Sequence, residues 1–334
     1  MPGADLTETT YLRAITTTLA EAMRVDPRVL VLGEDVAEGG PWGATAGLAE
    51  EFGAERVRNT PISEAAICGI AVGAAQSGLR PVVEIMFVDF VTLALDQLVN
   101  QAAKAHFMSG GQLRVPMVLR TQGGAGQRGG AQHSQSLEAW LTHVPGLKVV
   151  MPSTAADAAG LLASAIADDN PVVYVENKTL YFRSEDVQEA RRVQLGRAQV
   201  VRSGRDVTVV ALSRLVHESL AAAEELAAEG IEVEVIDPRT LVPLDLDAIV
   251  DSVARTHRLV VAHEAVEHGG VGAEIAAEVQ AAAFDELDAP IARVGAPFTS
   301  IPVSPGLEDA YLPGAEEIRA AVLAGIGEPV GGMT

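Results

Sequence analysis

The sequence of 334 residues has almost no cysteine and no long apolar run. Cys68 is its only cysteine, which excludes an internal disulfide and a cysteine-rich metal site. No apolar stretch reaches the roughly 18 residues that a membrane span requires. The start of the chain also lacks a basic segment followed by an apolar run. We therefore expect a cytoplasmic protein that does not enter a membrane.

Basic and aromatic residues are scarce as well. Lysine and arginine together number 24 against 45 acidic residues, which gives a formal net charge of -21. Because binding to nucleic acid requires a face rich in lysine and arginine, we expect no nucleic-acid partner. Aromatic residues make up 4% of the chain, so the core must consist mainly of alanine, valine, leucine and isoleucine. The hydrophobic fraction of 48% is that of an ordinary globular protein.

Short apolar runs alternate with helical patterns along the chain. The predicted strands of the first half are 29–32, 81–86, 116–120, 148–151 and 172–175, and its predicted helices are 9–24, 63–76, 90–108 and 154–167. The alternation stops in a segment of mixed charge and resumes near residue 206. This pattern predicts an α/β fold with two parallel-sheet domains. We place the first domain at 1–182, a surface linker at 183–205 and the second domain at 206–327.

Residues 60–75 place a single carboxylate at the start of an apolar helix. Thr60 is a suitable N-cap and Pro61 a suitable first helical residue, which puts Glu64 in the first turn. No charged residue then follows until Arg80. A first-turn acid commonly just complements the helix dipole, which is worth about 0.3–1 kcal/mol. A carboxylate on a buried helix can also be a catalytic acid, so the segment alone leaves both alternatives.

We considered three other functional motifs, and the sequence supports none of them. The run Gly124-Ala125-Gly126-Gln127-Arg128-Gly129 has dinucleotide-binding spacing, but no helix opens there and no acid follows about 20 residues later. It indicates a flexible glycine-rich loop beside a site that needs access. His263 and His268 are five residues apart, whereas a helical metal pair requires four, so we expect no metal there. No Gly-x-Ser-x-Gly elbow supports a serine hydrolase.

His133 directly follows the glycine-rich loop. A lone histidine is more often a hydrogen-bonded structural residue than a catalyst. However, histidine changes charge near neutral pH, and this one stands beside a flexible polar loop. A structural and a catalytic role therefore both stay open for His133.

Several short motifs occur in a fixed order along nearly the whole chain. They are Gly33-Glu34-Asp35-Val36, Thr60-Pro61-Ile62-Ser63-Glu64, Glu84-Ile85-Met86-Phe87-Val88-Asp89-Phe90, Met108-Ser109-Gly110-Gly111, Gln132-His133-Ser134-Gln135, Pro145-Gly146-Leu147-Lys148 and Asp237-Pro238-Arg239-Thr240-Leu241. In this order they resemble the β subunit of the thiamine-diphosphate-dependent decarboxylating component of 2-oxoacid dehydrogenase complexes. Pyruvate, branched-chain 2-oxoacid and acetoin dehydrogenases belong to that family. The resemblance implies a transketolase-like pyrimidine-binding domain followed by a transketolase C-terminal domain.

The resemblance also implies roles for individual residues. Glu64 corresponds to the glutamate that hydrogen-bonds N1′ of the cofactor's aminopyrimidine and so activates its thiazolium carbon. His133 corresponds to an active-site histidine near the reacting carbon and the lipoyl group. Phe90 corresponds to an aromatic residue that lies against the aminopyrimidine, and Ile62 and Met86 fall in the same cofactor-binding motifs.

Two further positions are assigned by the resemblance. Glu34 corresponds to an acid of a proton relay between two cofactor sites, but another acid of that relay is replaced by Leu93. Asp168 and Asn170 stand in a turn that holds a monovalent cation, such as K⁺, in some relatives.

The sequence contains no Gly-Asp-Gly, the motif through which thiamine enzymes bind Mg²⁺ and the diphosphate. A hard cation and several negative charges require oxygen ligands that this chain does not supply in that motif. We therefore expect an α subunit to provide the Mg²⁺ ligands, in an α2β2 heterotetramer with the active site at the interface.

The main hypothesis is thus a β subunit that, with its α subunit, oxidatively decarboxylates a 2-oxoacid and acylates the lipoyl domain of a dihydrolipoyl acyltransferase core. The substrate is expected to be pyruvate or a branched-chain 2-oxoacid, with the β subunit of an acetoin dehydrogenase as the alternative. A non-catalytic scaffold subunit is a hypothesis from another class. A stand-alone transketolase-like transferase is opposed by the missing diphosphate motif and by the short chain.

Overall fold

The computed structural model describes residues 7–187 and 192–327, which form two compact α/β units. The first unit extends to Gly196 and also includes Thr240–Pro243, and the second contains Arg197–Arg239 and the chain from Leu244 onward. The predicted fold class, two α/β domains with mainly parallel sheets, is confirmed. Positions 1–6 of the predicted first domain and 188–191 of the predicted linker lie outside the described residues.

The first unit is built on a seven-stranded sheet with the order β12-β6-β7-β5-β4-β2-β3. The strands are β2 (Val29–Gly33), β3 (Val57–Asn59), β4 (Arg80–Ile85), β5 (Val118–Gly123), β6 (Lys148–Val150), β7 (Val172–Asn177) and β12 (Thr240–Val242). All neighbours pair in parallel except β12 with β6. Their near-continuous valine and leucine content is typical of strands that are covered on both faces.

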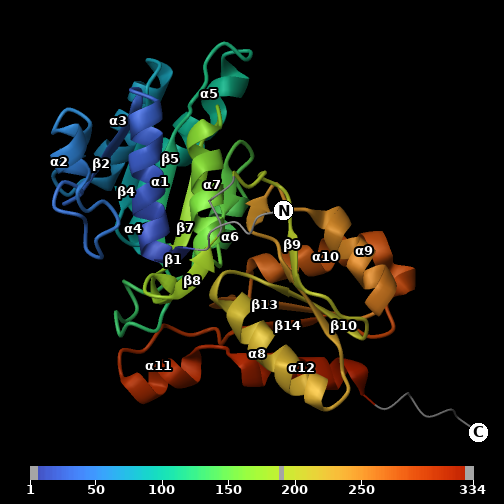
Figure 1. Ribbon diagram of the computed structural model, residues 1–334. Helices are drawn as coiled ribbons and strands as arrows, with labels where there is room; N and C mark the ends of the chain where they lie inside the picture. Colours follow the sequence, from blue (N-terminus) through green and yellow to red (C-terminus); the bar gives the residue numbers. More distant parts are fainter. Residues whose placement is uncertain (1–6, 188–191, 328–334) are drawn as a thin grey trace, which may run out of the picture. The chain divides into compact units, whose positions relative to one another are not determined.

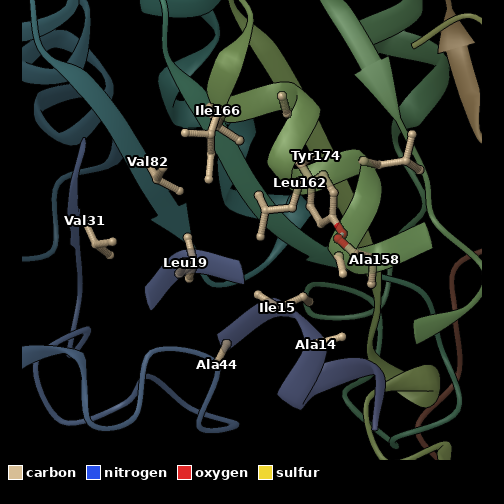
Figure 2. Packing of buried hydrophobic residues seen from close by; sticks show 14 of the residues in the cluster. Ala14, Ile15, Leu19, Val31, Ala44, Val82, Ala158, Leu162, Ile166 and Tyr174 are labelled. Atoms are coloured by element: carbon tan, nitrogen blue, oxygen red, sulfur yellow. The ribbon is translucent and has the colours of Figure 1, made fainter. Parts of the chain in front are cut away.

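Helices cover both faces of this sheet. On one face α1 (Tyr11–Val25) lies beside α7 (Ala155–Ala167), as Figure 1 shows. Figure 2 shows Ile15 and Leu19 of α1 and Leu162 of α7 in the hydrophobic core, which also contains Val82 of β4. On the other face lie α3 (Glu64–Gln76) and α4 (Val88–Asp96), which pack on each other and on β4 and β5. Shorter elements complete the unit: α2 (Leu48–Phe52), α5 (Ala103–Met108), α6 (Glu138–Thr142), a 3₁₀ turn at Lys178–Leu180, and the antiparallel pair β1 (Thr7–Thr10) and β8 (Ser184–Val187).

The second unit is a five-stranded sheet with the order β14-β13-β10-β11-β9. Its strands are β9 (Gln199–Arg202), β10 (Val207–Ala211), β11 (Val233–Asp237), β13 (Leu259–Val266) and β14 (Ala292–Ala296), and its helices are α8 (Arg214–Ala228), α9 (Leu246–Thr256), α10 (Val271–Ala283), α11 (Pro305–Tyr311) and α12 (Ala315–Ile326). Only β9 is antiparallel to its neighbour. Helices α8 and α12 close its main hydrophobic core. Among the described residues of both units, no helix combines the length and the apolar character needed to cross a membrane.

The structure corrects three local predictions. Helix α3 begins at Glu64 with Ser63 at the N-cap, so Thr60 and Pro61 are not its first residues. The reason is that Thr60 is held as an extension of β3, where its N–H donates to the carbonyl of Gly33 at 2.9 Å. The predicted helix over 90–108 is three segments, because a π-helical stretch at Gln97–Ala102 separates α4 from α5. The mixed-charge segment at 183–205 contains strands β8 and β9.

A fully buried ion cluster joins the three central strands of the first unit. The guanidinium of Arg120 on β5 donates to Glu84 on β4 at 2.6 Å and, through two nitrogens, to Glu176 on β7 at 2.7 and 2.9 Å. The hydroxyl of Tyr181 also donates to Glu176. Burial alone opposes the charge on Arg120, but Glu176 and Glu84 hold the pKa of its guanidinium above the ordinary value. Burial also raises the pKa of Glu176.

Replacing Arg120 by methionine should strongly destabilise the first unit. The variant would leave two buried carboxylates without their cation, which costs about 3–5 kcal/mol when one partner of a buried pair is removed. The chain's two tryptophans, Trp42 and Trp140, both belong to this unit, so their fluorescence during urea unfolding measures the loss.

Arg24→Met is the matched control. It removes an arginine that makes the same two-nitrogen contact, with Glu51, but at a site where the arginine side chain is 53% exposed. Exposed pairs contribute little because water screens them. Equal losses for Arg120→Met and Arg24→Met would contradict a structural role of the buried cluster.

Candidate functional site

The predicted site residues of the first unit gather at one edge of its sheet. Glu34 directly follows β2, and residues 60–64 follow β3. Met86 follows β4, and the loop that carries His133 follows β5. Since these strands are parallel, all four segments leave the sheet at its carboxyl edge, where open α/β sheets bind ligands.

Glu34 and Glu64 form the first group at this edge. The residue before Glu34, Gly33, must lack a side chain, because a Cβ at this position would lie 2.7 Å from the carbonyl oxygen of Glu84. Burial raises the pKa of Glu34, and the charges of Glu64 and Asp35 raise it further. Glu64 is 7% exposed in the first turn of α3. The structure therefore brings together two acids that are 30 positions apart in the sequence.

Three rings form the second group. The imidazole of His133 meets the ring of Phe90 edge-on, with centroids 5.3 Å apart, and the ring of Phe87 in the same way at 4.8 Å. Phe87 and Phe90 are also edge-on to each other, at 5.8 Å. Edge-to-face contacts at these separations are favourable for aromatic rings. The two predicted residues Phe90 and His133 are thus in contact, whereas Phe87 was not predicted as part of the site.

The loop between β5 and His133 bends through backbone conformations that favour glycine. Gly124, Gly126 and Gly130 all have positive φ, at 90°, 97° and 70°. The loop is closed at its base, where the N–H of Gly124 donates to the carbonyl of Gln135 at 3.0 Å. The side-chain amide of Gln135 in turn donates to Asp89 on α4 at 2.8 Å. Asp89 thereby ties the His133 loop to the helix that carries Phe90.

Lys178 is a second residue that sequence reasoning missed. It directly follows β7, at the same edge of the sheet, and only 2% of its surface is exposed. Its ammonium donates to the backbone carbonyl of His133 and lies 5.0 Å from the centroid of the Phe87 ring. The sequence contains one available signal, because Lys178 is one of only three lysines in the chain and follows an apolar strand.

Polar atoms without partners concentrate near this edge. Among the residues that the structure describes, buried atoms with no hydrogen-bond partner include Thr60 Oγ1, Glu84 Oε1, Asp89 Oδ2, Thr121 Oγ1, both amide atoms of Gln122, and Ser134 Oγ. Buried polar atoms are normally hydrogen-bonded, so such a group indicates an edge built to receive a polar ligand. Met86 is half-buried within this group, whereas Ile62 is 81% exposed.

Asp168 and Asn170 lie in the turn after α7, at the opposite edge of the sheet. The ammonium of Lys148, the first residue of β6, donates to Asp168, and Asn170 donates to the same carboxylate. Arg80, the first residue of β4, donates to the carbonyl of Asp168 at 2.9 Å. A monovalent cation would have to share this carbonyl with a guanidinium, and its binding there stays a prediction.

The described ranges, 7–187 and 192–327, contain no group of three or more histidine, cysteine, aspartate or glutamate residues arranged to hold a metal ion. His263 and His268, which were not expected to form a metal-binding pair, also differ in the groups that they contact. His263 is buried in β13 and lies 3.1 Å from the carbonyl of Ala265 through Nδ1, while the ring of His268 packs on Phe298.

Comparison with known families covers both units. The family described as "Transketolase, pyrimidine binding domain" matches residues 7–183, and the family described as "Transketolase, C-terminal domain" matches residues 196–318. Among solved structures, a split-gene transketolase described as an inactive β4 tetramer has a TM-score of 0.78 at 25% identity, with 97% of this chain and 99% of that chain covered. A transketolase from Leishmania mexicana, at 19% identity and a TM-score of 0.73, shows the same fold over 97% of this chain and 46% of its own.

Curated relatives are considerably more similar. The chain is 47% identical to the β subunit of the acetoin:2,6-dichlorophenolindophenol oxidoreductase of Bacillus subtilis, over 95% of this chain and 96% of that one. It is 46% identical to the β subunit of the pyruvate dehydrogenase E1 component of Rhizobium meliloti, over 96% and 71% of the two chains. The corresponding subunit of Rickettsia felis is 47% identical over 94% and 97%. The chain therefore belongs to the transketolase-like family of β subunits that includes those of pyruvate dehydrogenase E1 components and acetoin dehydrogenases.

Proposed function

We propose that this protein is the β subunit of a thiamine-diphosphate-dependent enzyme that oxidatively decarboxylates a 2-oxoacid and passes the acyl group to a lipoyl domain. The observation that carries the proposal is the carboxyl edge of the seven-stranded sheet. There a buried acid, Glu64, a second acid with a raised pKa, Glu34, and the Phe90–His133 ring pair share one edge with unpartnered polar atoms.

The residues at this edge fit the aminopyrimidine end of the cofactor. When bound, thiamine diphosphate supplies a nucleophilic carbon and an electron sink for the loss of CO2. Glu64, buried in the first turn of α3, would hold a proton at the aminopyrimidine N1′. Phe90 would pack against the ring without donating a hydrogen bond. Met86 and Ile62 would complete the apolar lining.

His133 would act on the acyl-transfer side of the site. Its ring is half-buried and oriented by two phenylalanines, which leaves the imidazole able to exchange a proton with an incoming group. That group would be the lipoyl thiol or disulfide of the acyltransferase partner. This assignment makes His133 and Glu64 responsible for different half-reactions.

An α subunit is proposed to complete the site. The sequence lacks Gly-Asp-Gly, so Mg²⁺ and the diphosphate would be held by the partner chain. Helix α3 has an exposed side that contains Ala65, Ala66 and Gly73 as well as Ile70, whose exposed fraction is 59%. Small apolar residues permit the close approach of a helix from another chain. Burial of the exposed Ile70 side chain at such a contact is favourable. The inactive β4 tetramer of the split-gene transketolase is consistent with a β-type chain that needs a different partner.

The choice between a 2-oxoacid and acetoin depends on the whole pocket. The identities to the acetoin oxidoreductase subunit and to the pyruvate dehydrogenase subunit differ by a single percentage point, at 47% and 46%. We propose the 2-oxoacid as substrate and acetoin as the alternative. Steady-state rates of the reconstituted enzyme with pyruvate, 2-oxoisovalerate and acetoin decide between them.

Glu64→Gln should abolish activity while leaving the fold intact. Glutamine has the same shape but cannot supply the proton, and the loss of a general acid-base group costs about 10²–10⁴-fold in rate. The measurement is reduction of 2,6-dichlorophenolindophenol by the co-purified α and β chains with each candidate substrate.

Glu55→Gln is the control for this substitution, because the Glu55 side chain is 91% exposed and should not affect the rate. A Glu64→Gln enzyme with full activity would favour the scaffold hypothesis. Full activity of the β chain without any partner would contradict the shared site.

The raised pKa of Glu34 predicts a specific pH dependence of stability. The native pKa exceeds that of the unfolded chain, so the contribution of Glu34 is fully present below the ordinary pKa and is lost as pH rises through the native value. Glu34→Gln lacks this titration. The stability of the variant relative to the parent should therefore increase as pH rises through that window, as measured by urea unfolding at several pH values.

Glu51→Gln provides a control of opposite sign. The hydrogen bond from Arg24 lowers the pKa of Glu51, so its contribution is present above the ordinary pKa and lost as pH falls. The stability of Glu51→Gln relative to the parent should decrease as pH rises from the lowered native pKa of Glu51 to the ordinary carboxyl pKa, which is a window below that of Glu34. A Glu34→Gln difference that stays constant or decreases with pH would contradict a raised native pKa of Glu34.

A further inference from the structure

The first unit contains a buried lysine that the proposed chemistry does not use. Lys178 follows the carboxyl end of β7, and its side chain is almost completely enclosed. Lysine is rarely buried in this way, because removing its charge from water is costly unless hydrogen bonds and charges compensate. An apolar side chain of similar length would fill the same space without that cost. The ammonium is therefore expected to have a use other than filling space.

Lys178 holds the glycine-rich loop at two points. Its ammonium donates to the backbone carbonyl of His133, after the last glycine of the loop. Its own backbone carbonyl accepts a hydrogen bond from the side-chain amide of Gln127, in the middle of the loop, at 3.0 Å. Between these points Arg128 and Gly130 adopt positive φ, at 61° and 70°. A loop of this kind has many accessible conformations, so two attachments to one residue restrict it strongly.

The same ammonium lies against the ring that orients the imidazole. Its Nζ is 5.0 Å from the centroid of Phe87, a distance at which a cation is attracted to an aromatic face. Phe87 meets the His133 ring edge-on at 4.8 Å. Lys178 thus acts on both the backbone of His133 and the principal neighbour of its side chain.

We propose that Lys178 is a positioning residue for His133, which sets the loop and imidazole for acyl transfer and does not take part in the steps that depend on Glu64. The inference rests on the proposed function, in which His133 serves the lipoyl half-reaction. A misplacement of about 1 Å in a reacting group costs on the order of 10²-fold in rate. The effect should therefore appear in acyl transfer to the lipoyl domain and be much smaller in dye reduction.

The test compares Lys178→Met with Lys178→Arg in the reconstituted enzyme. Lys178→Met should lower the rate of lipoyl acylation about 10- to 100-fold, with the KM for the 2-oxoacid and the rate of dye reduction nearly unchanged. Lys178→Arg keeps the charge and the donor, and it should restore most of the lost rate. Uniform loss of both rates in proportion to a lower melting temperature would show a merely structural role and overturn the proposal.

A second readout does not depend on activity. Amide hydrogen exchange of the isolated β chain, followed by mass spectrometry over residues 124–135, should be faster in Lys178→Met than in the parent. Unchanged exchange in that loop would overturn the proposal. If the parent enzyme decarboxylates no 2-oxoacid, the proposed function fails, while the exchange experiment still tests whether Lys178 fixes the loop.

Two further variants provide a control and an independent test. Lys104→Met is the matched control, because Lys104 also donates to a backbone carbonyl, that of Pro145, but at an exposed position away from His133. It should change neither lipoyl acylation nor exchange of the loop.

Gln127→Ala removes the other attachment of the loop and changes only an exposed side chain. It should act in the same direction as Lys178→Met, but more weakly. This variant therefore tests the attachment even if Lys178→Met folds poorly. Gln127→Ala with parental loop exchange and parental lipoyl acylation would contradict the two-point attachment.

Discussion

The buried contact between Arg120 and its two glutamates is the constraint on which the first unit depends. It links β4, β5 and β7, three strands from whose carboxyl ends segments of the candidate site leave the sheet. Burial raises the pKa of Glu176 although Arg120 opposes the shift, and the charge of Glu84 adds to the rise. Such a cluster tolerates little change in spacing. It therefore fixes the relative register of the three strands from which Met86, His133 and Lys178 emerge.

The proposed division of roles along the sheet edge follows from this fixed arrangement of strands. Glu34 and Glu64 leave the sheet at β2 and β3, whereas Phe90 and His133 belong to the segments after β4 and β5. An acid with a raised pKa, Glu34, on one side and an oriented imidazole on the other suit two successive proton-dependent reactions. Asp89 and Gln135 hold the two halves of the ring group together, so the site combines residues from a helix and a loop.

Much of this arrangement could be predicted from the sequence. The valine-rich strands and the helices between them were predicted at nearly their observed positions, because buried parallel strands and long helices give strong hydrophobic patterns. Glu64 and His133 were predicted as site residues from their local settings and from the family resemblance. The start of α3 was wrong, because pairing of Thr60 with β2 overrides its capping propensity. The contacts of Phe87 and Lys178 with His133 could not be predicted from the sequence, since they join positions more than 40 residues apart.

The exposed side of α3 links the surroundings of Glu64 to the proposed assembly. Glu64 occupies the first turn of the helix whose other side presents Ile70 and several small residues to solvent. A chain that covers this side also removes water from the helix, and a lower local dielectric shifts every charge interaction at its N-terminus. The surroundings of Glu64 therefore differ between the isolated chain and any assembly that covers this side of α3, even where the backbone is the same.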